Sequence, residues 1–295
     1  MLIKPATDNT PKILSGKTAR EALVGDLTRI FKNQIPAVEL TIIQVGNRDD
    51  SASYILAKKN LAETLGVIVH HIHLPETISQ IDLITEIQKN NTNSAVKGII
   101  VQLPLPAYLD REIVINAIDP CKDIDGLTAI NIQRLSEGRP NAIVPATARG
   151  VKELLLYYGI DVRAQKVTVV GRSALVGAPI AEICRGSGAI VTVAHSKTID
   201  LIKETIDADI LIVAVGKQKL IGAKHVHPGQ IVIDIGTNRE DDNTLVGDVD
   251  FESVSAILGP TGAITPVPGG VGPMTVLGLF ENLADIVMSD RHMLK

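Results

Sequence analysis

The sequence predicts an α/β protein of two domains, and three observations support this prediction. At 295 residues, the chain is long enough for roughly two domains with a substantial buried core. Strand-like and helix-like segments alternate along most of its length, which is typical of parallel sheets covered by helices. Aliphatic residues dominate while aromatic residues make up only 2%, as expected for strands that helices bury on both faces.

The first set of elements precedes residue 145. In chain order, we expect a helix at 16–33, a strand at 38–46, a helix at 53–66, a strand at 67–74, a helix at 81–89 and a strand at 97–105. A turn-rich stretch at 119–126 ends the set. We therefore place a first domain at 1–144 and expect the C-terminal helix, 274–295, to complete it.

The second set of elements is expected to form a domain at 145–273. A linking helix at 147–158, with Gly159 as its C-terminal cap, comes first. The strands that follow are expected at 166–171, 189–195, 209–216 and 230–236. This alternation predicts a Rossmann-like domain, with a ligand cleft between the two domains.

Composition excludes several classes of protein. A net charge of −4 and a pI near 6.0 argue against a generic nucleic-acid partner and favour a small molecule. We expect no membrane span, since no apolar stretch approaches the roughly 20 residues required, and the N-terminus lacks a signal-peptide core. Cys121 and Cys184 cannot form a disulfide framework, which fits the reducing cytoplasm.

The segment from Gly171 to Pro179 joins a strand to a helix through a glycine turn. Such a turn receives a pyrophosphate on backbone N–H groups at the helix N-terminus. The segment departs from G-x-G-x-x-G, because Ser173 replaces the second glycine and one extra residue precedes the last. An ordinary turn between strand and helix is the alternative.

The end of the next strand predicts which dinucleotide binds. An NAD-binding fold places Asp or Glu there, on the ribose 2′-hydroxyl. This chain instead has His195, Ser196 and Lys197. Arg172, Ser196 and Lys197 can donate to a 2′-phosphate, so we expect NADP as the cofactor.

Tyr54 and Lys58 are spaced to share one face of the expected helix at 53–66. The pair can hold a planar ligand on the phenol ring and transfer a proton with the amine, if burial lowers the lysine pKa. A solvated helix face is the alternative. The placement argues against a short-chain dehydrogenase, because its Y-x-x-x-K pair follows the dinucleotide loop, whereas this pair precedes Gly171 by more than a hundred residues.

Three further polar residues follow a predicted strand or lie in the turn-rich stretch. Gln102 comes directly after the apolar run from Gly98 to Val101, at the end of the strand that faces ligands in parallel sheets, and can orient a lysine. Asp123 and Asp125 lie beside Gly126, where a carboxylate can accept paired hydrogen bonds from an amidine-like ring edge. The alternatives are a polar strand cap for Gln102 and turn formation for the aspartates.

His70, His71 and His73 lie in one predicted strand. We expect His71 to face opposite to the other two, and no cysteine or carboxylate cluster accompanies them. We therefore expect no metal site.

Six segments occur in the order and approximate spacing of one family: SASYILAK, VKGIIVQLPLP, KDIDGL, VVGRSALVGAP, AHSKT and PGGVGPMTV. Over nearly its full length the chain resembles the methylenetetrahydrofolate dehydrogenase/cyclohydrolase family. The resemblance implies NADP-dependent oxidation of 5,10-methylenetetrahydrofolate, then hydrolysis of the methenyl product to 10-formyltetrahydrofolate. It also implies tetrahydrofolate derivatives as ligands, a cytoplasmic homodimer, and a place in one-carbon metabolism and purine biosynthesis.

The resemblance assigns roles to the residues singled out above. Lys58 would be the general acid/base, Tyr54 would stack on the folate, Gln102 would hold Lys58, and Asp125 would anchor the pterin with Asp123 nearby. Further expected substrate contacts are Ser51, Leu103, Pro104, Pro268, Gly269 and Gly270. The expected cofactor contacts are Gly171, Arg172, Ser173, Val176, Gly177, Pro179, His195, Ser196 and Thr237.

The run from Pro268 to Thr275 combines three glycines with two prolines, which predicts a rigid loop with a bare backbone. An ordinary turn from strand to helix is the alternative. Because the Gly171 loop is expected to take the pyrophosphate, we interpret the run as a rigid wall where pterin and nicotinamide meet. Gly270→Val would then impair folate binding and hydride transfer while sparing NADP binding.

Two departures from the family pattern affect the expected balance of the two activities. Ala146 and Ala148 replace a cysteine and a proline, and Thr237 replaces a branched apolar residue. Two other functions stay open. One is a different two-domain NADP dehydrogenase, of the shikimate or amino-acid type, and the other is a silent folate- or nucleotide-binding protein, one without catalytic activity. Intact Lys58 and Asp125 argue against the silent protein.

Overall fold

The computed structural model describes residues 10–240, 242 and 244–293, without the side chains of 49–51 and 290–293. Its contacts divide the chain into two compact units. One contains Thr147–Thr275 with the N-terminal segment up to Arg20, and is called the 147–275 unit. The other contains Glu21–Ala146 with the C-terminal segment from Val276, and is called the 21–146 unit.

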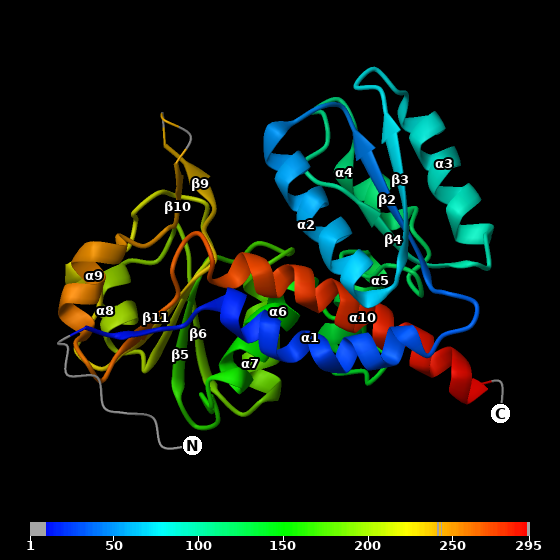
Figure 1. Ribbon diagram of the computed structural model, residues 1–295. Helices are drawn as coiled ribbons and strands as arrows, with labels where there is room; N and C mark the ends of the chain where they lie inside the picture. Colours follow the sequence, from blue (N-terminus) through cyan, green and yellow to red (C-terminus); the bar gives the residue numbers. More distant parts are fainter. Residues whose placement is uncertain (1–9, 241, 243, 294–295) are drawn as a thin grey trace. The chain divides into compact units, whose positions relative to one another are not determined.

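The 21–146 unit is built on three parallel strands in the order β3-β2-β4. They are β2 (Glu39–Val45), β3 (Ile68–Leu74) and β4 (Val96–Val101). Figure 1 shows α2 (Asp49–Leu65) and α3 (Gln80–Thr92) on opposite sides of this sheet. Leu40, Ile42 and Ile43 of the central strand are therefore fully buried, which explains the continuous apolar run in the sequence.

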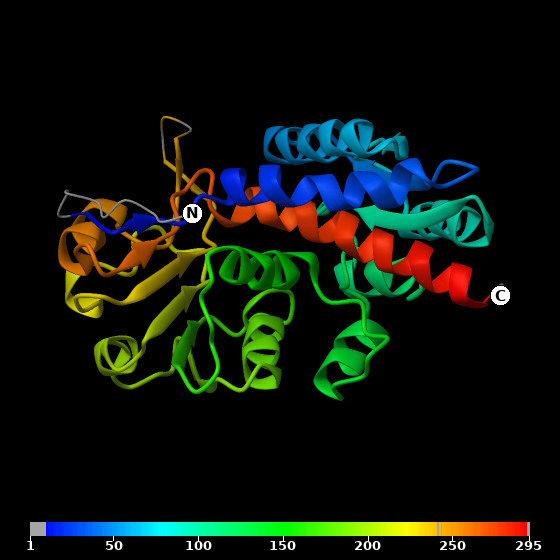
Figure 2. The ribbon, with the colours of Figure 1, turned by 60° about the horizontal axis from the view of Figure 1, so that its bottom comes forward.

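Four other helices contribute to this unit. Their bounds are α1 (Gly16–Lys32), α4 (Arg111–Asn116), α5 (Ala129–Ser136) and α10 (Val271–Met293). Figure 2 shows α1 and α10 running alongside each other. The C-terminal helix begins earlier than expected, because Pro273 occupies its first turn, where a missing N–H costs nothing.

Helix α10 corrects one expectation from the sequence. Its segment Val271–Ser289 is long and apolar enough to cross a membrane by length and composition alone. However, 61% of that segment is buried in the protein, with Leu277, Phe280 and Leu283 completely enclosed. Packing in the protein core therefore accounts for its apolar character.

The 147–275 unit contains a six-stranded parallel sheet in the order β1-β11-β8-β7-β5-β6. Its strands are β1 (Lys12–Ile13), β5 (Lys166–Val170), β6 (Ile190–Ala194), β7 (Ile210–Val213), β8 (Ile231–Asp234) and β11 (Ala263–Ile264). Counted from β5, the strand order is 2-1-3-4-5, with β1 added at one edge. The order reverses between β5 and β7, which is the switch point where ligands bind in doubly wound sheets.

Helices cover both faces of this sheet, with α6 and α7 on one side and α8 and α9 on the other (Figure 1). Their bounds are α6 (Ala146–Tyr157), α7 (Gly177–Gly186), α8 (Leu201–Ile206) and α9 (Phe251–Leu258). A 3₁₀ turn, η1 (Ala223–His225), and a short hairpin of β9 (Asn238–Arg239) and β10 (Leu245–Val246) complete the unit. The α/β class predicted from the sequence is confirmed.

The N-terminal segment differs from the expected domain bounds. Residues Lys12 and Ile13 pair with β11 in the 147–275 unit, although the sequence placed them in a domain at 1–144. The Lys12 ammonium lies 4.9 Å from the centre of the Tyr158 ring, and the Tyr158 hydroxyl donates to the Ser15 carbonyl at 3.1 Å. A two-residue strand is too short to show a sequence period, so its position could not be predicted.

Candidate active site

Two polar side chains meet inside the 21–146 unit. Lys58 lies on α2, and Gln102 is the first residue after β4. The Lys58 Nζ donates to the Gln102 Oε1 at 2.9 Å, and both residues are buried. Gln102 is fixed in turn, because its Nε2 donates to the Leu103 carbonyl at 2.7 Å and its backbone N–H donates to Ile43 at 2.8 Å. The amide can therefore hold the amine in one place.

The loop between α4 and α5 gives Asp123 and Asp125 different surroundings. Asp123 is fully buried, and its carboxylate accepts hydrogen bonds from the N–H groups of Gly126 (2.9 Å) and Thr128 (2.8 Å) and from Asn131 Nδ2 (3.0 Å). These bonds shape the loop itself, as Asx turns do. Asp125 is half-buried, so a ligand can reach its carboxylate, whereas that of Asp123 is enclosed.

Burial pushes Lys58 and Asp125 toward their neutral forms. The pKa of Lys58 is lowered from 10.5 by burial, and the negative charge of Asp125 opposes this shift. The pKa of Asp125 is raised from 3.8 by burial, lowered by Lys58 and raised again by Asp123. A lysine whose pKa falls toward neutrality can accept and return a proton at physiological pH.

The other predicted substrate contacts of this unit lie nearby in the chain. Tyr54 is half-buried and lies one helical turn before Lys58 on α2. Leu103 is half-buried and packs on the hydrophobic core, while Pro104 is exposed. The side chain of Ser51 lies outside the described part of the structure.

The three histidines of β3 do not arrange as expected. His71 and His73 share a face, with nearly parallel rings 6.1 Å apart, and His70 lies on the opposite face, because strand side chains alternate. Lys59 Nζ lies 3.0 Å from His71 Nδ1, and Gln44 Oε1 lies 2.9 Å from His71 Nε2. The pKa of His71 is lowered by burial, then by Lys59 and His73. Within the described residues, no group of three or more His, Cys, Asp or Glu residues is placed to hold a metal ion.

In the 147–275 unit, Gly171 occupies the switch point of the sheet. Its φ of 122° disfavours other residues, and a Cβ there would overlap the carbonyl oxygen of Ala214. A Cβ on Gly177 would overlap the carbonyl of Gly171. Both glycines therefore allow two backbone segments to pack more closely than any side chain would permit. Such a close-packed glycine loop is typical of a dinucleotide site, and the loop from Gly171 to Gly177 is called the Gly171 cradle.

The first turn of α7 differs from the expected phosphate site. The Ser173 hydroxyl accepts the N–H of Val176 at 3.2 Å, the Ser173 carbonyl accepts that of Ala178 at 3.0 Å, and Pro179 has no N–H. By contrast, the N–H groups of residues 172–175 donate to no acceptor in the part of the chain described here. These loop groups, ahead of the helix, are the ones free to bind a pyrophosphate.

The predicted 2′-phosphate residues are brought together by strand register. Val170 of β5 pairs with Ala194 of β6, and Arg172 and Ser196 each lie two residues beyond this pair. Both are exposed, and the half-buried His195 lies between Ala194 and Ser196. Adjacent parallel strands therefore place an arginine and a serine at the same end of the sheet.

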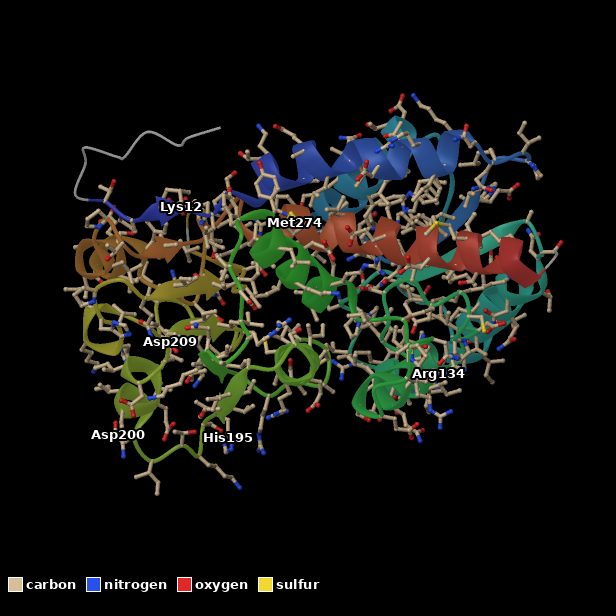
Figure 3. The ribbon with its side chains drawn as sticks, turned by 90° about the horizontal axis from the view of Figure 1, so that it is seen from below. Lys12, Arg134, His195, Asp200, Asp209 and Met274 are labelled. Carbon is tan, nitrogen blue, oxygen red and sulfur yellow. The ribbon has the colours of Figure 1, made fainter. Side chains whose placement is uncertain are left out.

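The first carboxylate after β6 belongs to Asp200, which caps α8 by accepting the N–H of Lys203 at 3.0 Å. Figure 3 labels His195 and Asp200 at the two ends of the loop that leaves β6. No acidic residue lies between them, so this loop offers donors to a ribose phosphate.

The proline and glycine run packs within the 147–275 unit. Pro268 is exposed and Gly269 has a φ of 102°, while the Gly269 carbonyl accepts the N–H of Lys17 at 3.2 Å. A Cβ on the buried Gly270 would overlap the Pro266 carbonyl. Gly270→Val would therefore distort this unit itself, so the expected sparing of NADP binding no longer follows from the geometry.

Three buried polar residues were missed in the sequence. The Asn282 Nδ2 of α10 donates to the carbonyls of Ile124 and Val144 at 2.8 Å each, which fixes the Asp125 loop. Asp234 and Asp248 lie buried beside the end of β8. A polar residue inside an apolar segment was the available signal in LFENLAD and VIDIG.

The pKa of Asp234 is raised to about 6, chiefly by burial. Three backbone N–H groups lower it and the charge of Asp248 raises it.

The structure places the residues that depart from the family pattern. Thr237, three residues after Asp234, is exposed. Ala146 and Ala148 are buried at the start of α6, where their small side chains fit the packing.

Family sequence models match both halves of the chain. The model described as "Tetrahydrofolate dehydrogenase/cyclohydrolase, catalytic domain" matches residues 14–125. The model described as "Tetrahydrofolate dehydrogenase/cyclohydrolase, NAD(P)-binding domain" matches residues 145–291. The chain is also 43% identical over 277 residues to the "Bifunctional protein FolD" of Geobacillus thermodenitrificans, covering 92% of this chain and 96% of the relative.

Solved structures are similar over nearly the full length. A FolD methylenetetrahydrofolate dehydrogenase/cyclohydrolase from Campylobacter jejuni has a TM-score of 0.90 at 37% identity, covering 95% of this chain and 99% of that one. The Trypanosoma brucei enzyme, complexed with NADP cofactor and inhibitor, has a TM-score of 0.89 at 32% identity, covering 96% and 100%. A Thermus thermophilus shikimate dehydrogenase reaches only 0.54 at 14% identity, covering 85% and 99%, and so shares the fold alone.

Proposed function

The chain belongs to the tetrahydrofolate dehydrogenase/cyclohydrolase family, and we propose that the residues described above carry out its two reactions. The protein is a bifunctional enzyme of one-carbon folate metabolism. It oxidises 5,10-methylenetetrahydrofolate to the 5,10-methenyl cation with NADP⁺ and hydrolyses that cation to 10-formyltetrahydrofolate. The shikimate-type alternative is not supported, because its likeness is limited to the fold.

Lys58 is the general acid/base of this proposal. Hydrolysis of the methenyl cation requires water to attack the iminium carbon, lose a proton and pass a proton to the departing ring nitrogen. A buried amine with a lowered pKa can accept the first proton and donate the second. Its hydrogen bond to Gln102 at 2.9 Å is the observation that carries this role, because it fixes the buried amine in one place.

The remaining residues of the 21–146 unit bind and orient the folate. Asp125, half-buried and reachable, accepts the paired N–H groups of the pterin edge, while Asp123 shapes the loop that presents it. Tyr54 supplies a flat ring one helical turn from Lys58. Ser51, Leu103 and Pro104 are proposed as further folate contacts, as are Pro268, Gly269 and Gly270 of the other unit.

The 147–275 unit holds the dinucleotide, which supplies the hydride acceptor when bound. Gly171 and Gly177 let the loop pack closely on the backbone of Ala214 and of Gly171 itself. The free amides of 172–175, in this loop, receive the pyrophosphate. Arg172 and Ser196 hold the 2′-phosphate. The other proposed contacts are Ser173, Val176, Pro179, His195 and Thr237.

We further propose that the enzyme works as a cytoplasmic homodimer without a nucleic-acid or membrane partner. The folate-binding domain is proposed at 1–144 without the N-terminal strand β1, completed by 274–295, and the NADP-binding domain at 145–273 with β1 added to its sheet. The bacterial relative named above supports the cytoplasmic location, and the burial of α10 supports the absence of a membrane span. Sedimentation analysis of the purified chain tests the dimer.

One assay tests the proposed function directly. The purified protein receives 5,10-methylenetetrahydrofolate and NADP⁺, and the absorbance of NADPH and of the methenyl product is followed, as is hydrolysis of added methenyltetrahydrofolate. Turnover in both assays is expected. Tight folate binding without turnover would identify a silent binding protein, and no folate binding would return the chain to another class of dehydrogenase.

A further inference from the structure

Two carboxylates lie completely inside the 147–275 unit with no ion-pair partner. Asp234 is the last residue of β8, and Asp248 lies between β10 and α9. Their exposed fractions are 3% and 0%. In the part of the chain that the structure describes, neither forms a salt bridge. A buried charge is costly unless hydrogen bonds compensate it, so their bonding pattern requires an explanation.

The Asp248 carboxylate holds one short loop by its backbone. Its Oδ2 accepts the N–H groups of Val215 (2.7 Å) and Gly216 (2.9 Å), and its Oδ1 accepts that of Lys217 (2.8 Å). The Asn238 Nδ2 supplies a fourth bond at 2.9 Å. Three successive amides therefore point at one side chain distant in the sequence.

This loop lies at the switch point of the sheet. Val213, the last residue of β7, pairs with Val170 on one side and Asp234 on the other, so the three strands end at the same level. A Cβ on Gly171 would overlap the carbonyl of Ala214, the first residue after β7. The loop that Asp248 holds is therefore the neighbour of the dinucleotide cradle.

Asp234 fixes Asp248 in the same way. Its carboxylate accepts the backbone N–H groups of Asp248 and Val249, each at 3.0 Å, and of Gly236 at 2.9 Å. A Cβ on Gly247 would overlap this carboxylate. The two aspartates thus connect the ends of β7 and β8 in one chain of hydrogen bonds.

We propose that Asp248 is a positioning residue for the dinucleotide. It sets the affinity for NADP by holding the backbone of residues 215–217 next to the Gly171 cradle. The proposal rests on the dehydrogenase function given above. Asp248 does not touch the cofactor in this account. It acts through the three amides that it orders, with Asp234 as its support.

A carboxylate suits this task better than its amide. An ionised aspartate is an acceptor at both oxygens, so it can receive all four donors. In Asp248→Asn, one of the two positions becomes an NH₂ group that faces other N–H donors. The variant therefore keeps the volume of the side chain while losing part of its hold on the loop.

The experiment compares Asp248→Asn with Asp250→Asn, a matched change two residues away whose side chain makes no helix-capping bond. The KM for NADP⁺, the dehydrogenase kcat, the cyclohydrolase rate and hydrogen exchange at residues 215–217 are measured in both. Asp248→Asn is expected to raise the NADP⁺ KM about tenfold, far more than it changes cyclohydrolysis, with faster exchange at 215–217. Asp250→Asn is expected to match the parent chain.

Two outcomes overturn the proposal. One is an unchanged NADP⁺ KM in a folded Asp248→Asn protein, and the other is an equal loss of both activities with faster exchange throughout the chain, which identifies a merely structural role. If Asp248→Asn does not fold, Asn238→Ala removes one donor to the same carboxylate and must still raise the NADP⁺ KM. An inactive parent chain would instead contradict the proposed function.

Discussion

The two candidate sites use polar groups in opposite ways. In the 21–146 unit, the working side chains are buried and face one another, as Lys58 and Gln102 do. In the 147–275 unit, Arg172 and Ser196 are exposed, and the close contacts are made by bare backbone at Gly171 and Gly177. Proton transfer needs a pKa that burial has shifted, whereas a dinucleotide needs room and donors.

This difference predicts which kind of substitution damages each site. Catalysis at the folate site depends on the shifted pKa of one buried side chain, so even a substitution of similar size should abolish it. The nucleotide site should be sensitive to the addition of a single carbon at a glycine and less sensitive at its exposed side chains. The two activities of one chain allow both statements to be tested in parallel.

Lys58→Met is expected to have the largest effect. Loss of the general acid/base should lower the cyclohydrolase rate by roughly 10²–10⁴-fold, because no other amine takes its place. Lys59→Met is the matched control, since Lys59 bonds His71 on another face of α2. Steady-state hydrolysis of methenyltetrahydrofolate measures both variants. Equal rates in the two would remove Lys58 from its role.

Gly171→Ala is expected to weaken NADP⁺ binding by about 10–100-fold, since the residue has a φ of 122° and no space for a methyl group. The cyclohydrolase reaction needs no dinucleotide and should change far less. Gly186→Ala, at the end of α7 with nothing close to its Cβ position, is the control. Isothermal titration with NADP⁺ gives the affinities. An unaltered affinity in Gly171→Ala would contradict the backbone cradle.

Arg172→Ala combined with Ser196→Ala is expected to have a smaller and more selective effect. Hydrogen bonds to a charged phosphate contribute roughly 1.5–3 kcal/mol each, and exposure reduces this value, so an approximately tenfold loss for NADP⁺ is expected. NAD⁺, which has no 2′-phosphate, should be little affected. Kinetics with the two cofactors measure the selectivity, and an equal loss for both would show that these residues do not hold the phosphate.

Much of the fold could be predicted because its elements are long and periodic. The strands β2 and β5 and the helices α2 and α6 follow the expected segments closely. The strand β1 has only two residues, so its hydrophobic pattern carried no information. The apolar character of α10 indicated burial but could not show what covers it.

The candidate sites divide along a similar line. Local spacing predicted that Tyr54 and Lys58 share a helix face, and strand ends predicted Gln102. The bonds of Ser173 within the first turn of α7 could not be predicted, since they depend on local geometry that the motif does not specify. The three loop amides that donate to Asp248 lie 31–33 residues before it in the chain, beyond any short sequence pattern.

The central claim is that burial lowers the pKa of Lys58 enough for catalysis, and the pH profile of cyclohydrolase kcat tests it most directly. The base must be neutral, so kcat, corrected for the uncatalysed rate, should rise with pH and level off above a midpoint below 10.5. Asp125→Asn removes the negative charge that raises this pKa, so its midpoint should move to lower pH. A profile with the same midpoint in both proteins, or one that persists in Lys58→Met, would contradict the account.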